Sequence, residues 1–169
     1  TFATVEREAT KRLKQARQRS TPLGFEEILQ RFPFTRAAAA AHLDLYQEYV
    51  DRLSYEQAIR TLESYIRDYD SDTRIAPEEI ARAKLQLVKL LFESGRRQEA
   101  KATSLALIEQ HGALIVSGVS GMSPGETIRQ YLQPRLSDPG LVTLPDAEPP
   151  ALRSPLGTAW RSPADLSTI

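Results

Sequence analysis

The sequence of 169 residues contains no cysteine. Disulfides, thiolate metal sites and a cysteine nucleophile are therefore excluded. It also lacks any apolar run approaching the 18 or so residues of a membrane-spanning helix, so we expect a soluble chain without a membrane span. There is no net charge, with 22 basic against 22 acidic residues, and we expect no general attraction to nucleic acid.

The usual signatures of catalysis are scarce. There is no glycine-rich phosphate loop, and His42 and His111 have no carboxylates clustered at metal-ligand spacing, so we predict no metal site. The stretch GMSPG, at 121–125, fits the nucleophile-elbow pattern, but an α/β-hydrolase places its histidine after the serine, and both histidines precede Ser123. Ser123 is better interpreted as a helix N-cap, with Glu126 three residues later. We predict a protein that is not an enzyme and has no cofactor.

Helical patterns fill most of the chain instead. Apolar residues recur at spacings of three and four, which predicts helices over 2–18, 22–32, 36–51, 54–69, 77–94, 97–111 and, from Ser123 to Leu132, a short one before Pro134. Pro22 and Pro77 suit first helical turns, and Thr35 is a plausible N-cap. Ser54 with Gln57 predicts a capping box, and Gly95 predicts a left-handed C-cap. The predicted class is all-α.

Two helical hairpins in the middle of the chain resemble one another. They span 36–69 and 77–111, and an offset of 42 residues places Ala58 on Ala100. We expect both alanines to lie where helices cross too closely for a larger side chain. A single hairpin of this kind leaves apolar surface on its back, so we expect the two to stack side by side.

The paired hairpins resemble the tetratricopeptide-repeat family over roughly residues 25–112. The stretch LDLYQEYVDRLSYEQAIRTLESYIRDYD carries the motif positions Leu45, Tyr49 and Ala58, and LQLVKLLFESGRRQEAKATSLALIEQHG carries Leu87, Leu91, Gly95 and Ala100. The chain departs from the family where its first-helix Trp is replaced by His42 and Lys84, and where its closing Pro is replaced by Asp70 and Gly112. FEEILQRFP resembles the end of a degenerate preceding unit, paired with the helix at 2–18.

This resemblance implies a curved array in which the first helix of each hairpin lines a concave groove. The groove-facing residues would be Ala40, Leu43, Gln47, Val50, Asp51, Arg82, Leu85, Lys89, Phe92 and Glu93. Family members that grip a C-terminal carboxylate use Lys and Asn there, whereas Leu43, Gln47 and Leu85 stand here, so we do not expect that mode. The resemblance implies a non-enzymatic scaffold in a larger protein complex, with Gln47, Asp51, Arg82, Lys89, Phe92 and Glu93 contacting a protein partner. Trp160, the only tryptophan, lies outside the resemblance and is a further expected contact, because a buried tryptophan contributes a large apolar area.

Composition changes after Gly112, where most of the glycines and prolines lie. We divide the chain into a helical repeat domain (1–112), a loop with a short helix (113–138) and an extended proline-rich tail (139–169) anchored by Trp160. PPALRSPLGTAWRSP, at 149–163, resembles the lead-in to a quinoprotein-type β-propeller in large bacterial proteins. That likeness favours the bacterial envelope over the cytoplasm, and an alternative role as the helical accessory domain of a longer propeller-containing protein. The first residue, Thr1, fits a piece of a longer chain.

The first predicted helix leaves a third interpretation open. Over residues 1–20 the basic residues outnumber the acidic residues Glu6 and Glu8, and they are Arg7, Lys11, Arg12, Lys14, Arg17 and Arg19. Such a helix is typically a solvated face, but a helical repeat that binds RNA through it is an alternative. Binding to phosphate would make the affinity fall steeply with rising salt.

Overall fold

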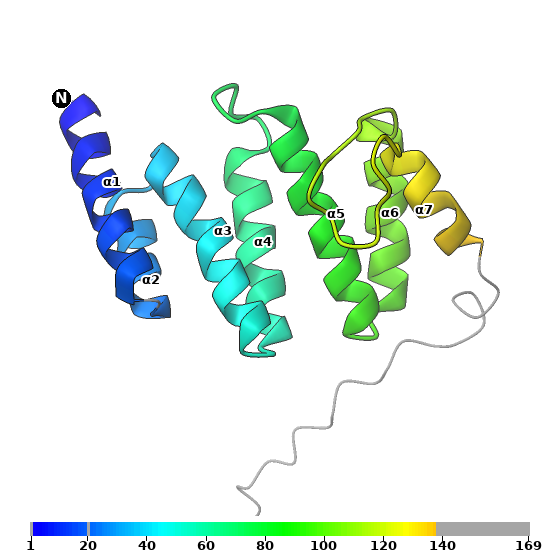
Figure 1. The fold of residues 1–169 in the computed structure, drawn as a ribbon, viewed down its shortest axis with the longest axis horizontal. Coiled ribbons are helices and arrows are strands. Elements are labelled where there is room, and N and C mark those ends of the chain that lie inside the picture. The colour runs from blue at the N-terminus through cyan, green and yellow to red at the C-terminus, as the bar shows by residue number, and fades with distance from the viewer. Residues whose placement is uncertain (1, 20, 138–169) are drawn as a thin grey trace, which may run out of the picture.

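The computed structural model describes residues 2–19 and 21–137, and Figure 1 shows them as a row of helices. The seven helices of this part of the chain are α1 (Phe2–Arg19), α2 (Pro22–Arg31), α3 (Arg36–Asp51), α4 (Tyr55–Tyr69), α5 (Pro77–Glu93), α6 (Arg97–His111) and α7 (Ile128–Leu136). The all-α prediction is confirmed, and the predicted bounds of the first six helices agree to within one or two residues. Within the described residues, no helix has the length and apolarity to cross a membrane.

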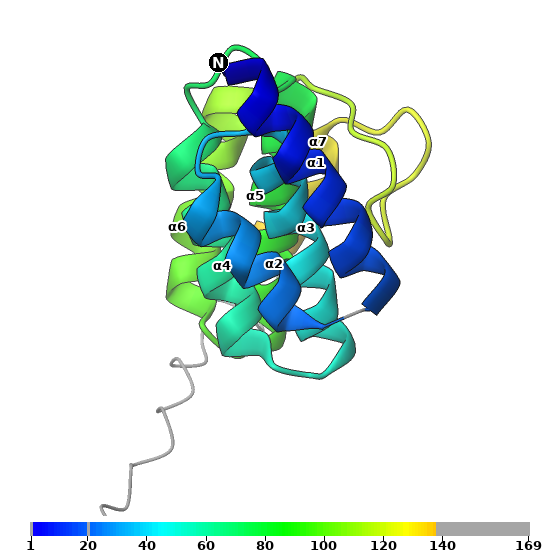
Figure 2. The same ribbon diagram turned by 90° about the vertical axis from the view of Figure 1, so that its left-hand side faces the viewer.

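The helices pack as consecutive antiparallel pairs, α1 with α2, α3 with α4 and α5 with α6. In the view along the array from its α1 end, the first helices of the pairs lie toward one side and the second helices toward the other (Figure 2). Each pair contacts the next, through α2 and α3 and then through α4 and α5. The predicted stacking of the two middle hairpins is therefore confirmed.

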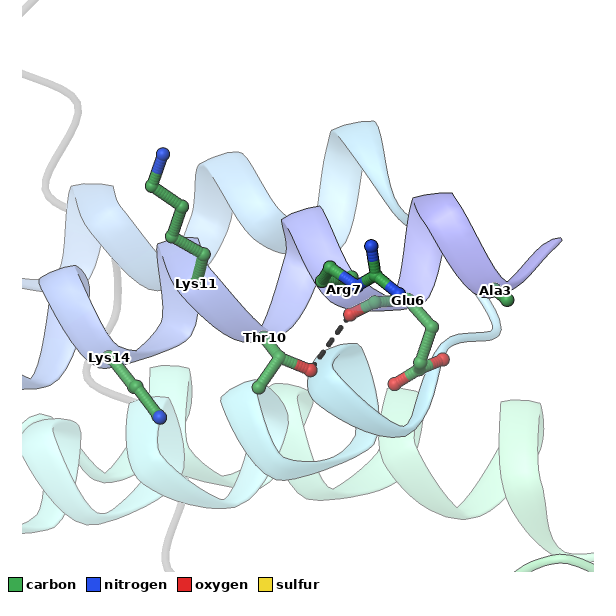
Figure 3. Close-up of a pocket in the computed structure, with 6 residues that line it drawn as sticks. All are labelled: Ala3, Glu6, Arg7, Thr10, Lys11 and Lys14. Carbon is green, nitrogen blue, oxygen red and sulfur yellow. Dashed lines mark hydrogen bonds between the residues drawn. The ribbon is translucent and has the colours of Figure 1, made fainter. Parts of the chain in front are cut away.

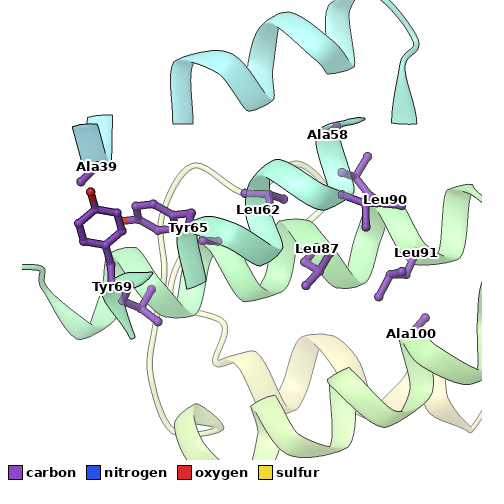
Figure 4. Packing of buried hydrophobic residues seen from close by; sticks show 12 residues of the cluster. Ala39, Ala58, Leu62, Tyr65, Tyr69, Leu87, Leu90, Leu91 and Ala100 are labelled. Atoms are coloured by element: carbon purple, nitrogen blue, oxygen red, sulfur yellow. The ribbon is translucent and has the colours of Figure 1, made fainter. Parts of the chain in front are cut away.

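A central core joins α4, α5 and α6, and Figure 4 shows its side chains. Ala58 of α4 and Ala100 of α6 are both fully buried in it, as their equivalent positions predicted. Larger side chains of α4 and α5 fill the space between them, including Leu62, Leu87 and Leu91. Burying one such leucine contributes about 1.5–3 kcal/mol relative to leaving it in water, so this core holds the two hairpins together.

The turns of the two hairpins have the same backbone structure. After α3, Leu53 has a φ of 56°, and the Ser54 amide donates to the Tyr49 carbonyl at 2.8 Å. After α5, Gly95 has a φ of 80°, and the Arg96 amide donates to the Leu91 carbonyl at 2.9 Å. Both are helix ends closed by a residue in the left-handed region and a bond back to the last turn. The left-handed Gly95 is confirmed, and a leucine takes its place in the first hairpin.

The helix starts agree with the sequence at some positions and not at others. Thr35 caps α3 as predicted, because its Oγ1 accepts from the Ala38 amide at 3.0 Å. The capping box predicted for Ser54 and Gln57 is wrong, since the Ser54 side chain makes no cap bond. In a capping box, the Gln57 side chain would accept from the Ser54 amide. That amide already donates to the Tyr49 carbonyl in the hairpin turn.

Polar contacts fix the first pair on α3. The Glu6 carboxylate of α1 accepts from the amides of Arg36 and Ala37, each at 3.2 Å, and so caps α3 from a neighbouring helix. Arg17 of α1 pairs with Asp44 of α3 at 2.7 Å. These contacts orient the first pair against the two repeated hairpins.

The segment after α6 closes the far end of the array. Its loop returns to the end of α6, where the Ile128 amide donates to the Leu114 carbonyl and the Arg129 amide to the Gly112 carbonyl, each at 3.0 Å. Side chains of the loop and of α7 then pack on the apolar faces of α5 and α6 at this end of the array. The buried members of this cluster are Ala81, Leu85, Val88, Leu107, Val116, Val119, Ile128, Tyr131 and Leu132.

The predicted bounds of the last helix are wrong at both ends. The Ser123 amide does donate to the Glu126 carboxylate at 2.8 Å. However, Gly125 has a φ of 81°, which breaks any helix that starts at Ser123. The helix begins at Ile128 instead, after a capping box formed by Thr127 and Gln130. It continues through Pro134, whose missing amide costs only one bond because the proline lies in the last turn.

Candidate functional site

A groove runs between α3 and α5, the first helices of the two repeated hairpins. It consists of two hollows of about 410 Å³ and 180 Å³ that share Leu43 and Glu79 on their walls. Three alanines, Ala39 and Ala40 of α3 and Ala83 of α5, line it with small side chains. A polypeptide backbone can approach α3 closely over such a surface.

Arg82 is the chemically distinctive residue of the groove. It lies on the α5 wall of the smaller hollow, facing Gln47 and Tyr46 of α3. Its Nε is buried, yet it donates to no acceptor in the described part of the chain. A buried donor without an acceptor costs about 1–3 kcal/mol, so this position favours a ligand oxygen.

The predicted partner-binding residues of α3, Gln47 and Asp51, lie toward its C-terminal end. Gln47 and Asp51 are exposed, and the Gln47 side-chain amide donates to the Asp51 carboxylate at 2.8 Å. Burial, with the carboxylates of Glu93 and Asp51 nearby, raises the pKa of Tyr46 above its usual range. Tyr46 lines the smaller hollow together with Gln47 and Arg82.

A second pocket, of about 520 Å³, lies between α5 and α7, and the remaining predicted residues of α5 are part of its lining. Lys89, Phe92 and Glu93 line it, and Lys89 pairs loosely with Glu93 at 3.8 Å. The predicted site is thus divided, because the groove holds Gln47 and Arg82 on one side of α5 and this pocket lies on the other. Asp51 is in neither lining.

Two groove-facing predictions turn out to be packing residues. Leu85 is buried in the cluster under α7, and Val50 packs on the central core. Ala40 and Leu43 do line the groove. Trp160 and the rest of the predicted tail lie outside the residues that the structure describes.

The α7 wall of the second pocket was not foreseen. Tyr131, Leu132 and Arg135 supply it, and the Arg135 guanidinium lies 3.7 Å from the centre of the Tyr131 ring. The sequence held one usable signal, the Thr127-x-x-Gln130 spacing of a capping box. The competing pair of Ser123 and Glu126, four residues earlier, has the same spacing and predicts a helix start at the wrong place.

The basic face of α1 borders a third hollow, of about 550 Å³, whose lining comes from α1 alone (Figure 3). Arg7, Lys11 and Lys14 make no ion pair within residues 2–19 and 21–137, but Lys11 and Lys14 point in different directions in Figure 3. Thr10 is exposed, and its hydroxyl donates back to the Glu6 carbonyl of the same helix at 2.8 Å. The face offers several separate cations and not one converging phosphate site.

The histidines occupy structural positions. His42 is buried against the rings of Tyr65 and Tyr69, each 6.0 Å away between ring centres. Burial lowers the pKa of His42 to about 4, so the ring is neutral at pH 7. Among the described residues, no group of three or more His, Asp or Glu side chains is placed to hold a metal ion.

Comparison of the chain with protein-family models, with curated proteins and with solved structures found no match.

Proposed function

We propose that this chain is a non-enzymatic scaffold of the tetratricopeptide-like kind, which binds a protein partner along the groove between α3 and α5. The observation that carries the proposal is Arg82, which lines that groove and whose buried Nε has no acceptor in the described part of the chain. An extended peptide brings a row of carbonyl oxygens and can supply the missing acceptor. The gain on binding is the relief of an unsatisfied donor.

The walls of the groove suit a peptide in two further ways. Ala39, Ala40 and Ala83 leave room for a backbone to lie close to the helices. Arg36 lines the larger hollow and Glu79 lines both, so the groove offers one charge of each sign. Specificity on such a surface comes from the few polar positions and from side-chain pockets, while the peptide backbone supplies the common contacts.

The tetratricopeptide-like assignment is part of the proposal and draws its support from the repeated structure. The two hairpins share their turn geometry at Leu53 and Gly95 and their buried alanines at Ala58 and Ala100. In a repeat array of this type, the helices that come first in each unit line a common binding surface. Here α3 and α5 are those helices.

Site-specific photocrosslinking tests the proposal. A photoreactive phenylalanine derivative is placed at Gln86, on the groove wall, and in a matched chain at Lys101, an exposed residue of α6. In extracts of the native source, we expect Gln86 to capture a discrete protein that Lys101 does not. The substitution Arg82→Met, which keeps the stem and removes the donors, should reduce that capture. Equal capture at both positions, or capture unaffected by Arg82→Met, would contradict the proposal.

The unpaired cations of α1 favour a second candidate, binding of RNA through Arg7, Lys11 and Lys14. Each phosphate contact releases counterions, so the affinity would fall steeply as the salt concentration rises. Fluorescence anisotropy with a labelled single-stranded RNA, at several salt concentrations, decides this point. Binding that is absent, or that survives in a chain carrying Lys11→Gln and Lys14→Gln, would remove this candidate.

A further inference from the structure

The pocket between α5 and α7 combines an apolar floor with an excess of positive charge. Leu85, Val88 and Leu132 form part of the floor, and Phe92 stands half-buried beside them. Three cations, Lys89, Arg97 and Arg135, surround it against one carboxylate, Glu93. A ligand that fits has aliphatic side chains and at least two negative charges.

Two of the three cations are available for such a ligand. In the described part of the chain, neither Arg97 nor Arg135 forms an ion pair with a carboxylate. Arg135 donates to the Tyr131 carbonyl at 2.5 Å and stacks on the Tyr131 ring, which holds its guanidinium at the rim of the pocket. The remaining N–H groups of this guanidinium can donate to a carboxylate.

The chain itself contains a segment of matching chemistry shortly after α7 in the sequence. Residues 141–148, LVTLPDAE, carry Leu141, Val142 and Leu144, followed by Asp146 and Glu148. No basic residue occurs between Leu136 and Arg153. Only the four residues at 137–140 separate this segment from the last residue of α7, and an extended chain of that length reaches about 13 Å.

From this match we infer that the pocket between α5 and α7 is an intramolecular docking site for residues 141–148. The aliphatic side chains enter the apolar floor, and the carboxylates of Asp146 and Glu148 pair with Arg97 and Arg135. The short connection gives the segment a millimolar effective concentration at the pocket, so modest contacts suffice. The docked segment covers Lys89, Phe92 and Glu93 and withholds that side of α5 from other proteins.

Spin labelling of the full chain tests this inference directly, because the chain has no native cysteine. A nitroxide is attached at Ala147→Cys, and the amide signals of an isotopically labelled sample are compared before and after reduction of the nitroxide. We expect loss of the signals of Phe92 and Leu132 in the oxidised state, with the signal of Ile28 in the first pair unchanged. Retention of the Phe92 and Leu132 signals would overturn the inference.

Charge reversal then tests the pairing. Arg97→Glu combined with Arg135→Glu should restore the Phe92 signal, and adding Asp146→Lys and Glu148→Lys should abolish it again. Lys101→Glu, an equal charge change on the exposed face of α6, should have no effect. Retained helicity by circular dichroism shows that the reversed chain still folds. Insensitivity to the reversal, or failure of the compensating pair to abolish the signal, would contradict the inference.

A mixed sample separates docking within one chain from docking between two. Isotopically labelled chain without the nitroxide is combined with unlabelled chain that carries it. An intramolecular segment leaves the labelled signals intact, whereas loss at Phe92 in the mixture would show that a second copy supplies the segment and would overturn the inference as stated. No external partner enters these measurements, so their outcome is independent of the function proposed for the α3–α5 groove.

Discussion

Lys84 of α5 reaches back to Asp70, the residue that ends α4, with 2.7 Å between its Nζ and the Asp70 carboxylate. The same Nζ donates to the Gln110 side chain of α6 at 2.9 Å. Lys84 is only 9% exposed, so its charge lies at the junction of the two repeated hairpins. This one ammonium group therefore joins three helices.

Removal of the partner carboxylate should destabilise the fold. In Asp70→Ala the ammonium of Lys84 stays buried with Gln110 as its remaining partner, and we expect a loss of about 1–2 kcal/mol, less than for a fully buried pair because Asp70 is half-exposed. Lys84→Met removes the charge altogether and should cost less. Urea unfolding followed by circular dichroism measures both. Glu109→Ala, on the exposed face of α6, is the control, and a loss in Asp70→Ala no larger than in that control would refute this account.

The two hairpin turns give a matched pair of glycine predictions. Leu53 is exposed and has a φ of 56°, a conformation that costs a residue with a Cβ about 1–2 kcal/mol. Leu53→Gly should therefore raise the melting temperature, with a net gain of about 0.5–1 kcal/mol after the added freedom of the unfolded chain. Gly95→Ala, at the equivalent position, should lower it by a similar amount. Opposite signs at the two sites are the expected result, and equal signs would be inconsistent with it.

Stability should fall in mild acid because of His42. Its pKa is about 4 in the folded chain, where burial disfavours the charged ring, and about 6.5 in the unfolded chain. The unfolded chain thus binds the proton first as the pH falls, so the stabilisation present above pH 6.5 is lost progressively down to pH 4. The difference corresponds to about 3 kcal/mol.

Urea unfolding of the wild type and of His42→Gln between pH 7 and pH 4 tests this assignment. The variant should lose clearly less stability over that range. Burial also lowers the pKa of the half-buried His111, so His111→Gln serves as the comparison, and a larger effect there would show that the dependence was assigned to the wrong histidine.

The close packing at Ala100 should not tolerate a larger side chain. Ala100 of α6 is fully buried where this helix packs on α5. Ala100→Leu should therefore force α5 and α6 apart, at a cost of about 1–3 kcal/mol. Ala102, two residues later, is exposed. Ala102→Leu should change the free energy of unfolding by less than about 0.5 kcal/mol, as measured by thermal unfolding. Similar losses in both variants would mean that the buried contact at Ala100 is not limiting.

Helix positions followed from the sequence wherever the signal was local. Pro22, Pro77 and Thr35 act at helix starts through their own backbone or side chain, so a single position predicts the boundary. The cap that Glu6 supplies to α3 depends on contact between helices some thirty residues apart, and no local pattern indicates it. The left-handed turn at Leu53 is local, but leucine gives no signal for it, because a residue with a Cβ rarely adopts a positive φ.

The candidate site was predictable in part for the same reason. Helical spacing places Gln47 and Arg82 on the facing walls of one groove once the hairpins stack. The spacing could not show that α7 returns onto α5, because that contact depends on the loop 112–127 and its glycine at 125. The returning helix is what separates Lys89, Phe92 and Glu93 from the groove residues.

Because α7 and its loop occupy the apolar faces of α5 and α6, a duplicated hairpin fits better inside the array than after α6. A copied hairpin inserted after Gly112 would have to displace Val116, Ile128 and Leu132 before it found a surface to stack on. A copy inserted between α4 and α5, in the loop 70–76, would meet on both sides the same kind of surface that the hairpins already present to one another.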